Sequence, residues 1–280
     1  MPNFELHLRL EMRIAVHAAD SRLREDSRYR DMIKGLEPFE PYFADSPSSL
    51  REGTDMILSA GGDGTYLTAA EMAFRAGIPV LGVNFGRLGF LSDCPPAKVA
   101  PALLAGEYVI EEREVLSSVT SDGDGEPCFA LNEIALTRIG PSMLGVDVRV
   151  GNDTLPTYWA DGLLIATSSG STAYSLSVGG PICTPDSKVL IISPIAPHNL
   201  NVRPLIVPSS SVLSLSLRSR EEAVTLSHDN RHLTISRDSS LTVSVAQFSL
   251  KRVRLFETNF MSALRSKLFW GEDARNESLR

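Results

Sequence analysis

The stretch Gly61-Gly62-Asp63-Gly64-Thr65 decides the fold of the N-terminal part of this chain. An apolar run at 56–58 precedes it, and apolar residues at helical spacing follow it over 66–74. Residues 78–83 (Ile-Pro-Val-Leu-Gly-Val) have the composition of a second strand. The glycine turn is therefore expected to join a strand to a helix within a βαβ unit that spans about 54–85.

This turn suits a phosphorylated ligand, and its carboxylate is the unusual part. Glycines let a ligand approach the backbone closely, and the N–H groups at a helix start can face phosphate oxygens. Asp63 is a negative charge in such a loop, so it needs a role of its own. It could take a proton from an attacking hydroxyl or help to hold a metal ion. A tight turn in which Asp63 caps the helix is an equal alternative.

Composition and charge exclude several classes of protein. The chain has 280 residues, of which 43% are hydrophobic and 22% charged, as expected for a globular protein with an ample core. Its formal charge of −7 argues against a nucleic-acid partner. Apolar runs are too short for a membrane helix, and the N-terminus lacks the pattern of a signal peptide. Three widely spaced cysteines suggest reduced thiols, so a cytoplasmic location is expected.

The pattern along the chain predicts an α/β N-terminal domain and an all-β C-terminal domain. From about residue 110, short β-branched runs alternate with turn signals, which is typical of packed β-sheets. Residues 35–53 are rich in Pro, Ser and acidic residues, and an irregular connection is expected there. A last pair of strands is expected near 241–256. We therefore expect an α/β domain over 1–110, a β domain over 111–256, and a helical segment over 257–280 that packs back on the first domain.

Two further groups of polar residues lie within apolar surroundings. In the stretch 158–181, Asp161 precedes an apolar strand that leads into Ser168-Ser-Gly-Ser-Thr172 and then Tyr174. Small hydroxyl residues suit phosphate or ribose groups, although a plain β-turn with a core tyrosine explains them as well. Asn132 and Glu133 interrupt an otherwise apolar strand. Such a pair must be satisfied by a structural network or by a ligand, because unpaired burial costs several kcal/mol.

Taken together, these segments resemble the NAD kinase family. The resemblance rests on Gly61–Thr65, on Gly82-Val-Asn-Phe-Gly-Arg-Leu-Gly-Phe-Leu91, on Asn132-Glu133, on residues 161–181, and on the phrase that begins at Ser193-Pro-Ile-Ala-Pro. Diacylglycerol and sphingosine kinases carry a similar first loop, so the later blocks are the more specific ones. Two positions depart from the common pattern: Ser168 stands where many relatives have proline, and Asp229-Asn230-Arg231 replaces a usual Asp-Gly-Gln.

The resemblance implies transfer of the γ-phosphate of ATP to the 2′-hydroxyl of the adenosine ribose of NAD, which gives NADP. It implies the two-domain fold shared with diacylglycerol kinases and a homodimer or homotetramer. Asp63 matches the base, and Phe90 matches a residue beside the adenine. Asn132 and Glu133 match ribose contacts, and Asp161 matches a residue near the nicotinamide carboxamide. The other matching positions line the nucleotide: Gly62, Gly64, Thr65, Ser169, Thr172, Ala173 and Tyr174.

The reaction also needs positive charge around the phosphates. Mg²⁺ is expected to arrive with the ATP phosphates, and no protein ligand is assigned to it. Arg87 and Arg203 are further candidates for ligand contact, and surface ion pairs would explain both equally well. Two other functions stay open: a lipid kinase of the diacylglycerol kinase type and a non-catalytic nucleotide sensor. The sequence leaves undecided the range of phosphoryl donors, the preference for NAD or NADH, feedback by NADP or NADPH, and the number of subunits.

Overall fold

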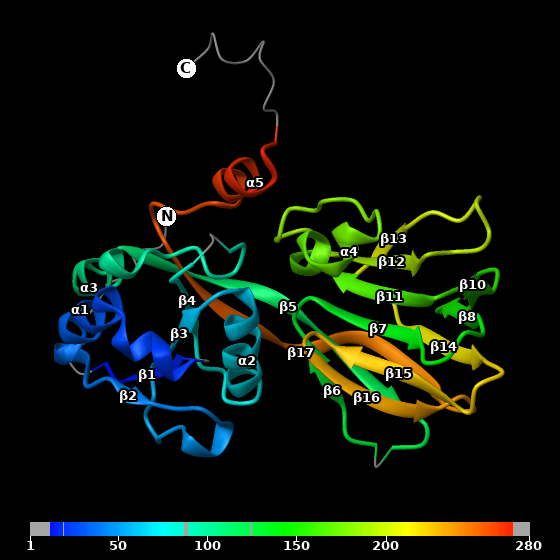
Figure 1. Ribbon diagram of the computed structural model, residues 1–280, viewed down its shortest axis with the longest axis horizontal. Coiled ribbons are helices and arrows are strands. Elements are labelled where there is room, and N and C mark those ends of the chain that lie inside the picture. The colour runs from blue at the N-terminus through cyan, green and yellow to red at the C-terminus, as the bar shows by residue number, and fades with distance from the viewer. Residues whose placement is uncertain (1–11, 19, 87–88, 124, 271–280) are drawn as a thin grey trace, which may run out of the picture. The chain divides into compact units, whose positions relative to one another are not determined.

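The computed structural model describes residues 12–18, 20–86, 89–123 and 125–270 (Figure 1). The chain divides into two compact units. The first holds the described residues up to Glu112 together with those from Leu250 onward, and the second holds Arg113–Ser249. Two long strands, β5 (Tyr108–Thr120) and β17 (Ser240–Leu255), have residues in both units. Within the described residues, no helix is both long and apolar enough to cross a membrane.

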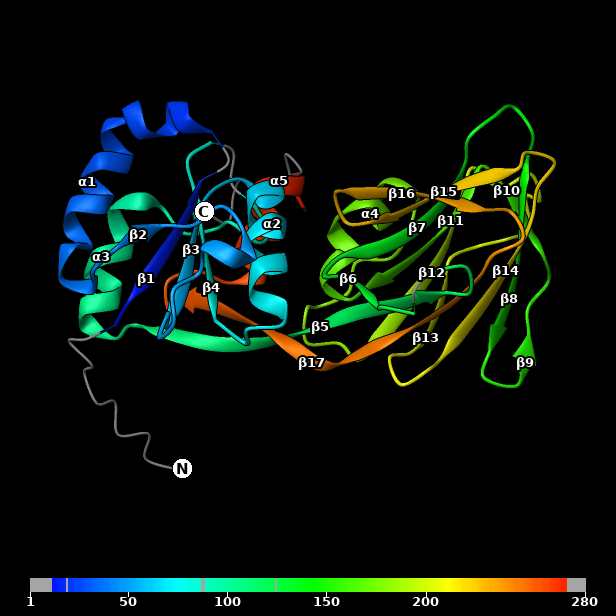
Figure 2. The same cartoon turned by 90° about the horizontal axis from the view of Figure 1, so that it is seen from below.

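The first unit is built on parallel strands in the order β2-β1-β3-β4, and the end of β17 continues the parallel pairing beside β4. Helices α1 and α3 cover one face of this sheet, and α2 covers the other (Figure 2). Strands covered on both faces consist of continuous apolar runs, and β3 is buried at every position except its last. The elements are β1 (Ile14–Ala18), η1 (Ser21–Glu25), α1 (Ser27–Gly35), η2 (Glu37–Phe39), β2 (Tyr42–Phe43), η3 (Pro47–Ser49), β3 (Met56–Gly61), α2 (Asp63–Phe74), β4 (Val80–Asn84), α3 (Pro96–Ala105) and α5 (Phe260–Leu268).

The second unit is all β except for one short helical stretch. Its six-stranded antiparallel sheet has the order β13-β12-β11-β7-β15-β16, and a second group of strands pairs in the order β10-β8-β14-β17. Its elements are β6 (Cys128–Ala130), β7 (Glu133–Arg138), β8 (Leu144–Val150), β9 (Asp153–Thr154), β10 (Tyr158–Ala160), β11 (Gly162–Thr167), η4 (Ser169–Thr172), α4 (Tyr174–Ser177), β12 (Val189–Ile195), β13 (Leu205–Pro208), β14 (Leu213–Arg218), β15 (Ala223–His228) and β16 (Arg231–Ser236).

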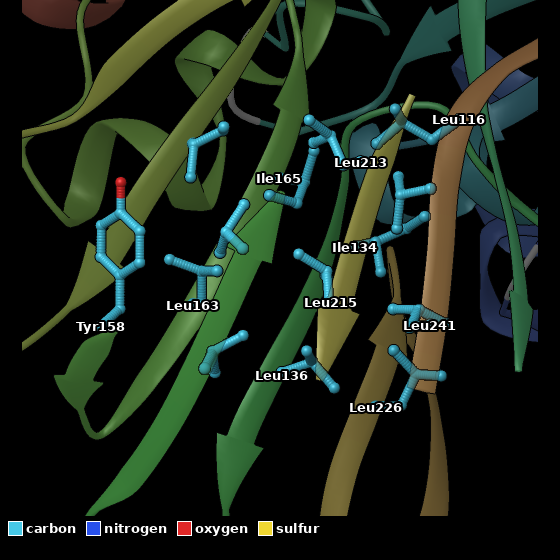
Figure 3. Close-up of a cluster of buried hydrophobic side chains, with 14 of the residues drawn as sticks. Leu116, Ile134, Leu136, Tyr158, Leu163, Ile165, Leu213, Leu215, Leu226 and Leu241 are labelled. Atoms are coloured by element: carbon cyan, nitrogen blue, oxygen red, sulfur yellow. The ribbon is translucent and has the colours of Figure 1, made fainter. Parts of the chain in front are cut away.

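The core of the second unit lies between these two groups of strands. Side chains from β7, β11 and β15 meet side chains from β5, β14 and β17, and Figure 3 shows this cluster. Leu136, Leu163 and Leu226 come from the six-stranded sheet, and Leu215 and Leu241 come from the other group. Alternation of inward apolar and outward polar residues, as in β14, places one face of each strand in this core.

The expected combination of an α/β domain with a β domain is confirmed, and two local predictions are wrong. The expected strand pair near 241–256 is one continuous strand, β17, because Leu241–Val243 pair with β14 while Arg252 and Val253 pair with β4. The stretch 35–53 is not wholly irregular. It contains β2, whose Tyr42 and Phe43 pair in parallel with Ala15 and Val16 of β1.

Candidate functional site

The glycine loop of the first unit connects β3 to α2, as the sequence predicts. Gly61 ends the strand, Gly62 precedes the helix without any side-chain cap, and Asp63 is the first helical residue. A Cβ on Gly61 would overlap the Thr65 side chain, so packing explains this glycine. Gly62 and Gly64 are different, since a Cβ on either would meet no atom within 4 Å. Packing inside the protein does not require glycine at 62 or 64, and both leave backbone open to a ligand.

The Asp63 carboxylate is an acceptor for three consecutive backbone N–H groups. Oδ2 accepts from Phe90 at 3.0 Å, and Oδ1 accepts from Leu91 at 3.1 Å and from Ser92 at 2.9 Å. A Cβ on Gly89 would overlap Asp63 Oδ1, so this close approach requires glycine at position 89. Asp63 therefore ties the segment after β4 to the glycine loop. This contact is different from the helix cap that was the simple alternative, since the N–H partners come from another segment.

A lysine from the C-terminal helix also reaches this carboxylate. Lys267 of α5 places its Nζ 3.4 Å from Asp63 Oδ2 and 4.3 Å from the centre of the Phe90 ring. Phe260, at the start of the same helix, packs against Phe90 with a ring-centre distance of 6.0 Å. The structure thus brings Asp63 and Phe90, both predicted from the sequence, together with Lys267, which the sequence analysis did not single out.

The second unit holds a second cluster around Asn132 and Glu133. Asp229 accepts hydrogen bonds from the backbone N–H groups of Leu131 at 2.7 Å, Asn132 at 2.8 Å and Glu133 at 3.1 Å. The carbonyl of Asn132 accepts from the backbone N–H of Thr167 at 2.9 Å. The polar pair is therefore fixed through its backbone, which leaves its side chains for other contacts.

The Asn132 side chain is buried, the Glu133 side chain is partly buried, and each has a buried oxygen without a partner. Asn132 Oδ1 and Glu133 Oε2 have no hydrogen-bond partner among the described residues. Burial, followed by the negative charge of Asp229, raises the pKa of Glu133 to about 8, while a bond from the backbone N–H of Tyr174 opposes this rise. Buried polar atoms are normally paired, so these two oxygens are candidates for hydrogen bonds with ligand hydroxyls or amides.

The serine-rich turn after β11 packs against this pair. A Cβ on Gly170 would overlap the backbone of Asn132, so the turn needs glycine there. Tyr174 follows with 39% of its surface exposed, although its backbone contacts Glu133. Gly170 and Tyr174 thus place this turn beside the Asn132–Glu133 pair. The predicted residues Ser169, Thr172 and Ala173 belong to the same turn.

Three other predicted residues are not part of these clusters. Asp161 forms an ion pair with Arg138 at 2.6 Å, beside the end of the β7–β11 pair where Gly162 faces Thr137. Glu133 lies at the other end of this pair, where it faces Ala166. Ala166 is five positions after Asp161 along extended chain, which is roughly 16 Å at about 3.3 Å per position. The exposed Arg203 donates to the carbonyls of Leu200 and Val202 in its own loop. Arg87 lies outside the described residues.

Sequence reasoning missed two residues that hold these clusters. Asp229 appeared in the sequence only as a turn residue, and Lys267 only as part of an amphipathic helix. Asp229 has a positive φ of 52°, which is consistent with the tight β15–β16 turn. Among the described residues, no group of three or more His, Cys, Asp or Glu side chains is placed to hold a metal ion.

An α/β unit with a carboxylate in its phosphate-type glycine loop, joined to a β unit with a buried polar pair, fits a phosphotransferase with an alcohol acceptor. Comparison with known proteins identifies the family. Residues 9–108 match the model of the ATP-NAD kinase N-terminal domain, and residues 131–255 match that of the ATP-NAD kinase C-terminal domain. An NAD kinase of Porphyromonas gingivalis is 41% identical over 266 residues, which are 94% of this chain and 92% of that protein. The chain therefore belongs to the ATP-NAD kinase family, and its activity is that of an NAD kinase.

Solved structures agree with this fold. The crystal structure of yeast NADH kinase complexed with NADH has a TM-score of 0.82 at 22% identity, covering 94% of this chain and 89% of that one, and supports the fold alone. The crystal structure of an NAD kinase from Archaeoglobus fulgidus in complex with ATP has a TM-score of 0.75 at 26% identity. It covers 92% of this chain and 99% of that chain.

Proposed function

We propose that this chain transfers the γ-phosphate of ATP to the 2′-hydroxyl of the adenosine ribose of NAD, which gives NADP and ADP. The observation that carries this proposal is the buried pair of oxygens, Asn132 Oδ1 and Glu133 Oε2, without hydrogen-bond partners among the described residues. A ribose presents adjacent hydroxyl groups, each a donor and an acceptor, which suits an amide beside a carboxylate. A lipid alcohol offers too few polar groups to satisfy both oxygens.

Each cluster has a role toward the acceptor. Asn132 and Glu133 bind the ribose hydroxyls, and Phe90 lies beside the adenine. The turn residues Ser169, Thr172, Ala173 and Tyr174 line the dinucleotide. Asp161 is assigned to the nicotinamide carboxamide, a role that requires the nicotinamide end to lie about one strand length from the ribose.

Asp63 acts as the base in this scheme. Its Oδ2 takes the proton of the 2′-hydroxyl as the 2′-oxygen forms a bond to the γ-phosphorus. The bond between the γ-phosphorus and the β,γ-bridging oxygen breaks, and ADP leaves with that electron pair. Positioning is a large part of the rate, because a secondary hydroxyl is a weak nucleophile until it is held against both groups.

The donor phosphates are held mainly by backbone. Gly62, Gly64 and Thr65 present the start of α2, where the two glycines leave space for phosphate oxygens. Mg²⁺ arrives with the triphosphate and neutralises part of its charge.

We also propose a homodimer or homotetramer in the cytoplasm. Strand β13 is an edge of the six-stranded sheet, and it exposes Leu205 and Ile206, which suits contact with a second copy. The three cysteines are unpaired, which suits a reducing compartment. Sedimentation analysis of the purified protein tests the oligomer: a single species at monomer mass would contradict it.

The acceptor assignment is tested by kinetics. With Mg²⁺-ATP and NAD, the wild type forms NADP, and Asn132→Ala raises the KM for NAD by at least about tenfold, because one lost hydrogen bond to a buried group costs about 1–3 kcal/mol. The KM for ATP stays near the wild-type value. Ser177→Ala, at an exposed position that ends α4, is the matched control. Phosphate transfer to diacylglycerol, or the absence of NADP, would contradict the proposal.

A further inference from the structure

Lys267 makes two contacts at the proposed base, a long hydrogen bond with Asp63 and a cation–π contact with Phe90. Its Nζ is 3.4 Å from Asp63 Oδ2, which is long for a charged hydrogen bond, and it lies 4.3 Å from the centre of the Phe90 ring. The Lys267 side chain as a whole is 27% exposed. An ammonium has three N–H donors, and this one uses a single donor toward the described residues.

The lysine occupies the last acceptor position of the carboxylate. Oδ1 accepts from two backbone N–H groups, those of Leu91 and Ser92. Oδ2 accepts from the backbone N–H of Phe90 and from Lys267. A carboxylate offers about four lone-pair positions. The backbone bonds are fixed by the fold, so Lys267 is the partner that must leave before Oδ2 can accept a proton.

Both contacts of Lys267 end on residues that the proposed function assigns to the acceptor. The 2′-hydroxyl needs Asp63 Oδ2, and the adenine lies beside Phe90. Binding of NAD therefore competes with the lysine at both places. The displaced ammonium then needs a new negative partner.

The donor triphosphate supplies that partner within reach. A hydroxyl under general-base catalysis lies about 3 Å from its base, and the attacked atom lies about 3–3.5 Å from the hydroxyl oxygen. The oxygens of the γ-phosphate are then within the range of a four-carbon side chain anchored on α5. Among the described residues, Lys267 is also the partner that provides positive charge to Asp63. The chain as a whole carries a formal charge of −7, so its overall field does not attract a polyanion.

We propose that Lys267 is a phosphate-binding residue for the donor. It covers the base in the free enzyme and moves to the γ-phosphate when NAD is bound. This inference rests on the proposed roles of Asp63 and Phe90. It makes donor binding depend on the acceptor, because NAD releases the cation that the triphosphate then uses.

Steady-state kinetics of Lys267→Met tests the proposal, because methionine keeps the apolar contact with Phe90 and removes the charge. Loss of a charge-assisted bond to phosphate raises the KM for ATP by about tenfold or more. The KM for NAD does not rise, since the acceptor does not use the lysine and the substitution removes the ammonium that competes with NAD at Asp63. Arg265→Met is the matched control, because Arg265 is an exposed cation on the same helix. Lys267→Arg restores charge and returns the KM for ATP toward the wild-type value.

A binding measurement separates this role from a structural one. Titration of wild-type protein with a non-hydrolysable ATP analogue and Mg²⁺, with and without NAD, is expected to show several-fold tighter binding when NAD is present. Lys267→Met is expected to lose this coupling. An unchanged affinity for the analogue in the presence of NAD would overturn the proposal even if the variant fails to fold.

One kinetic outcome would also overturn the proposal: an unaltered KM for ATP in Lys267→Met. With it, an increase in the KM for NAD would show that the lysine serves the acceptor, and faster turnover would show that the lysine only covers the base. A wild type that forms no NADP would instead contradict the proposed function, so the two failures are distinguishable.

Discussion

Replacing Asp229 by asparagine isolates the part of the site that positions Asn132 and Glu133. The backbone tolerates the change, since Asp229 has a φ of 52° and asparagine adopts the left-handed region as readily as aspartate. In the wild type, Oδ2 accepts from Leu131 at 2.7 Å, and Oδ1 accepts from Asn132 at 2.8 Å and Glu133 at 3.1 Å. The asparagine of the variant keeps one acceptor oxygen. Its NH₂ group is a donor and faces a backbone N–H, which is also a donor, so no hydrogen bond forms there.

Two magnitudes follow from this geometry. One charge-assisted hydrogen bond is lost, so we expect the free energy of unfolding to fall by about 2 kcal/mol. The charge of Asp229 is also the second cause, after burial, of the raised pKa of Glu133, which is about 8. The neutral side chain removes that cause, and the pKa of Glu133 moves down toward its ordinary range.

The pH dependence of NAD binding reports this shift. The ionised Glu133 accepts from ribose hydroxyls, whereas the protonated acid offers fewer acceptor positions. In the wild type, the KM for NAD is therefore expected to fall as the pH rises through about 8. In Asp229→Asn the same fall is expected at lower pH. Urea unfolding at constant m-value measures the stability change.

Two results would refute this reasoning. The first is an unfolding free energy within about 0.5 kcal/mol of the wild type, which is the usual range for a surface substitution without structural consequence. The second is a pH profile for the KM of NAD that does not move. Glu133→Gln serves as the control for the profile, because its side chain does not titrate.

Two further predictions test the glycine loop and a buried histidine. The Cβ of Gly62→Ala meets no protein atom within 4 Å, so this variant is expected to keep its thermal stability but to raise the KM for ATP by ~fivefold or more. The Cβ of Gly89→Ala overlaps Asp63, so this variant is expected to lose both stability and turnover. If the two variants had the same melting temperature and the same kinetics, the space for a ligand at Gly62 would be contradicted. Burial and the neighbouring Arg231 lower the pKa of His228 to about 4. Between about pH 4 and 6.5 the unfolded chain therefore binds more protons than the folded protein, and the free energy of unfolding is expected to rise with pH by up to about 1.4 kcal/mol per pH unit. Urea unfolding of His228→Gln is expected to show a smaller dependence on pH. A slope that is unchanged in the variant would show that other groups cause it.

The sequence predicts those features of the fold that depend on local pattern. The glycine loop lies between β3 and α2 because an apolar run, three glycines and a helical repeat are contiguous in the chain. The short runs after residue 110 form the β domain for the same reason. The strand β17 was not predicted as one element, because its continuity depends on two different partners, β14 and β4.

The contacts that complete the site depend on tertiary structure instead. Lys267 and Asp63 are 204 residues apart, and no periodicity connects them. The contacts of Asp229 are equally difficult to predict from the sequence, since its three N–H partners lie 96–98 residues earlier. Both aspartates accept hydrogen bonds from three consecutive backbone N–H groups. The sequence singles out Asp63 as a candidate base and Asp229 only as a turn residue, and it shows neither set of backbone contacts.

That likeness makes the two aspartates matched variants for the decisive measurement: formation of NADP from Mg²⁺-ATP and NAD by the wild type, Asp63→Asn and Asp229→Asn. Each variant disturbs the same kind of backbone contact, but only Asp63 is assigned to take the proton. We expect NADP from the wild type, a fall in kcat of at least ~10²-fold in Asp63→Asn, and a kcat within about tenfold of the wild type in Asp229→Asn. Undiminished turnover in Asp63→Asn, or an equal loss in both variants, would contradict the role of Asp63 as the base.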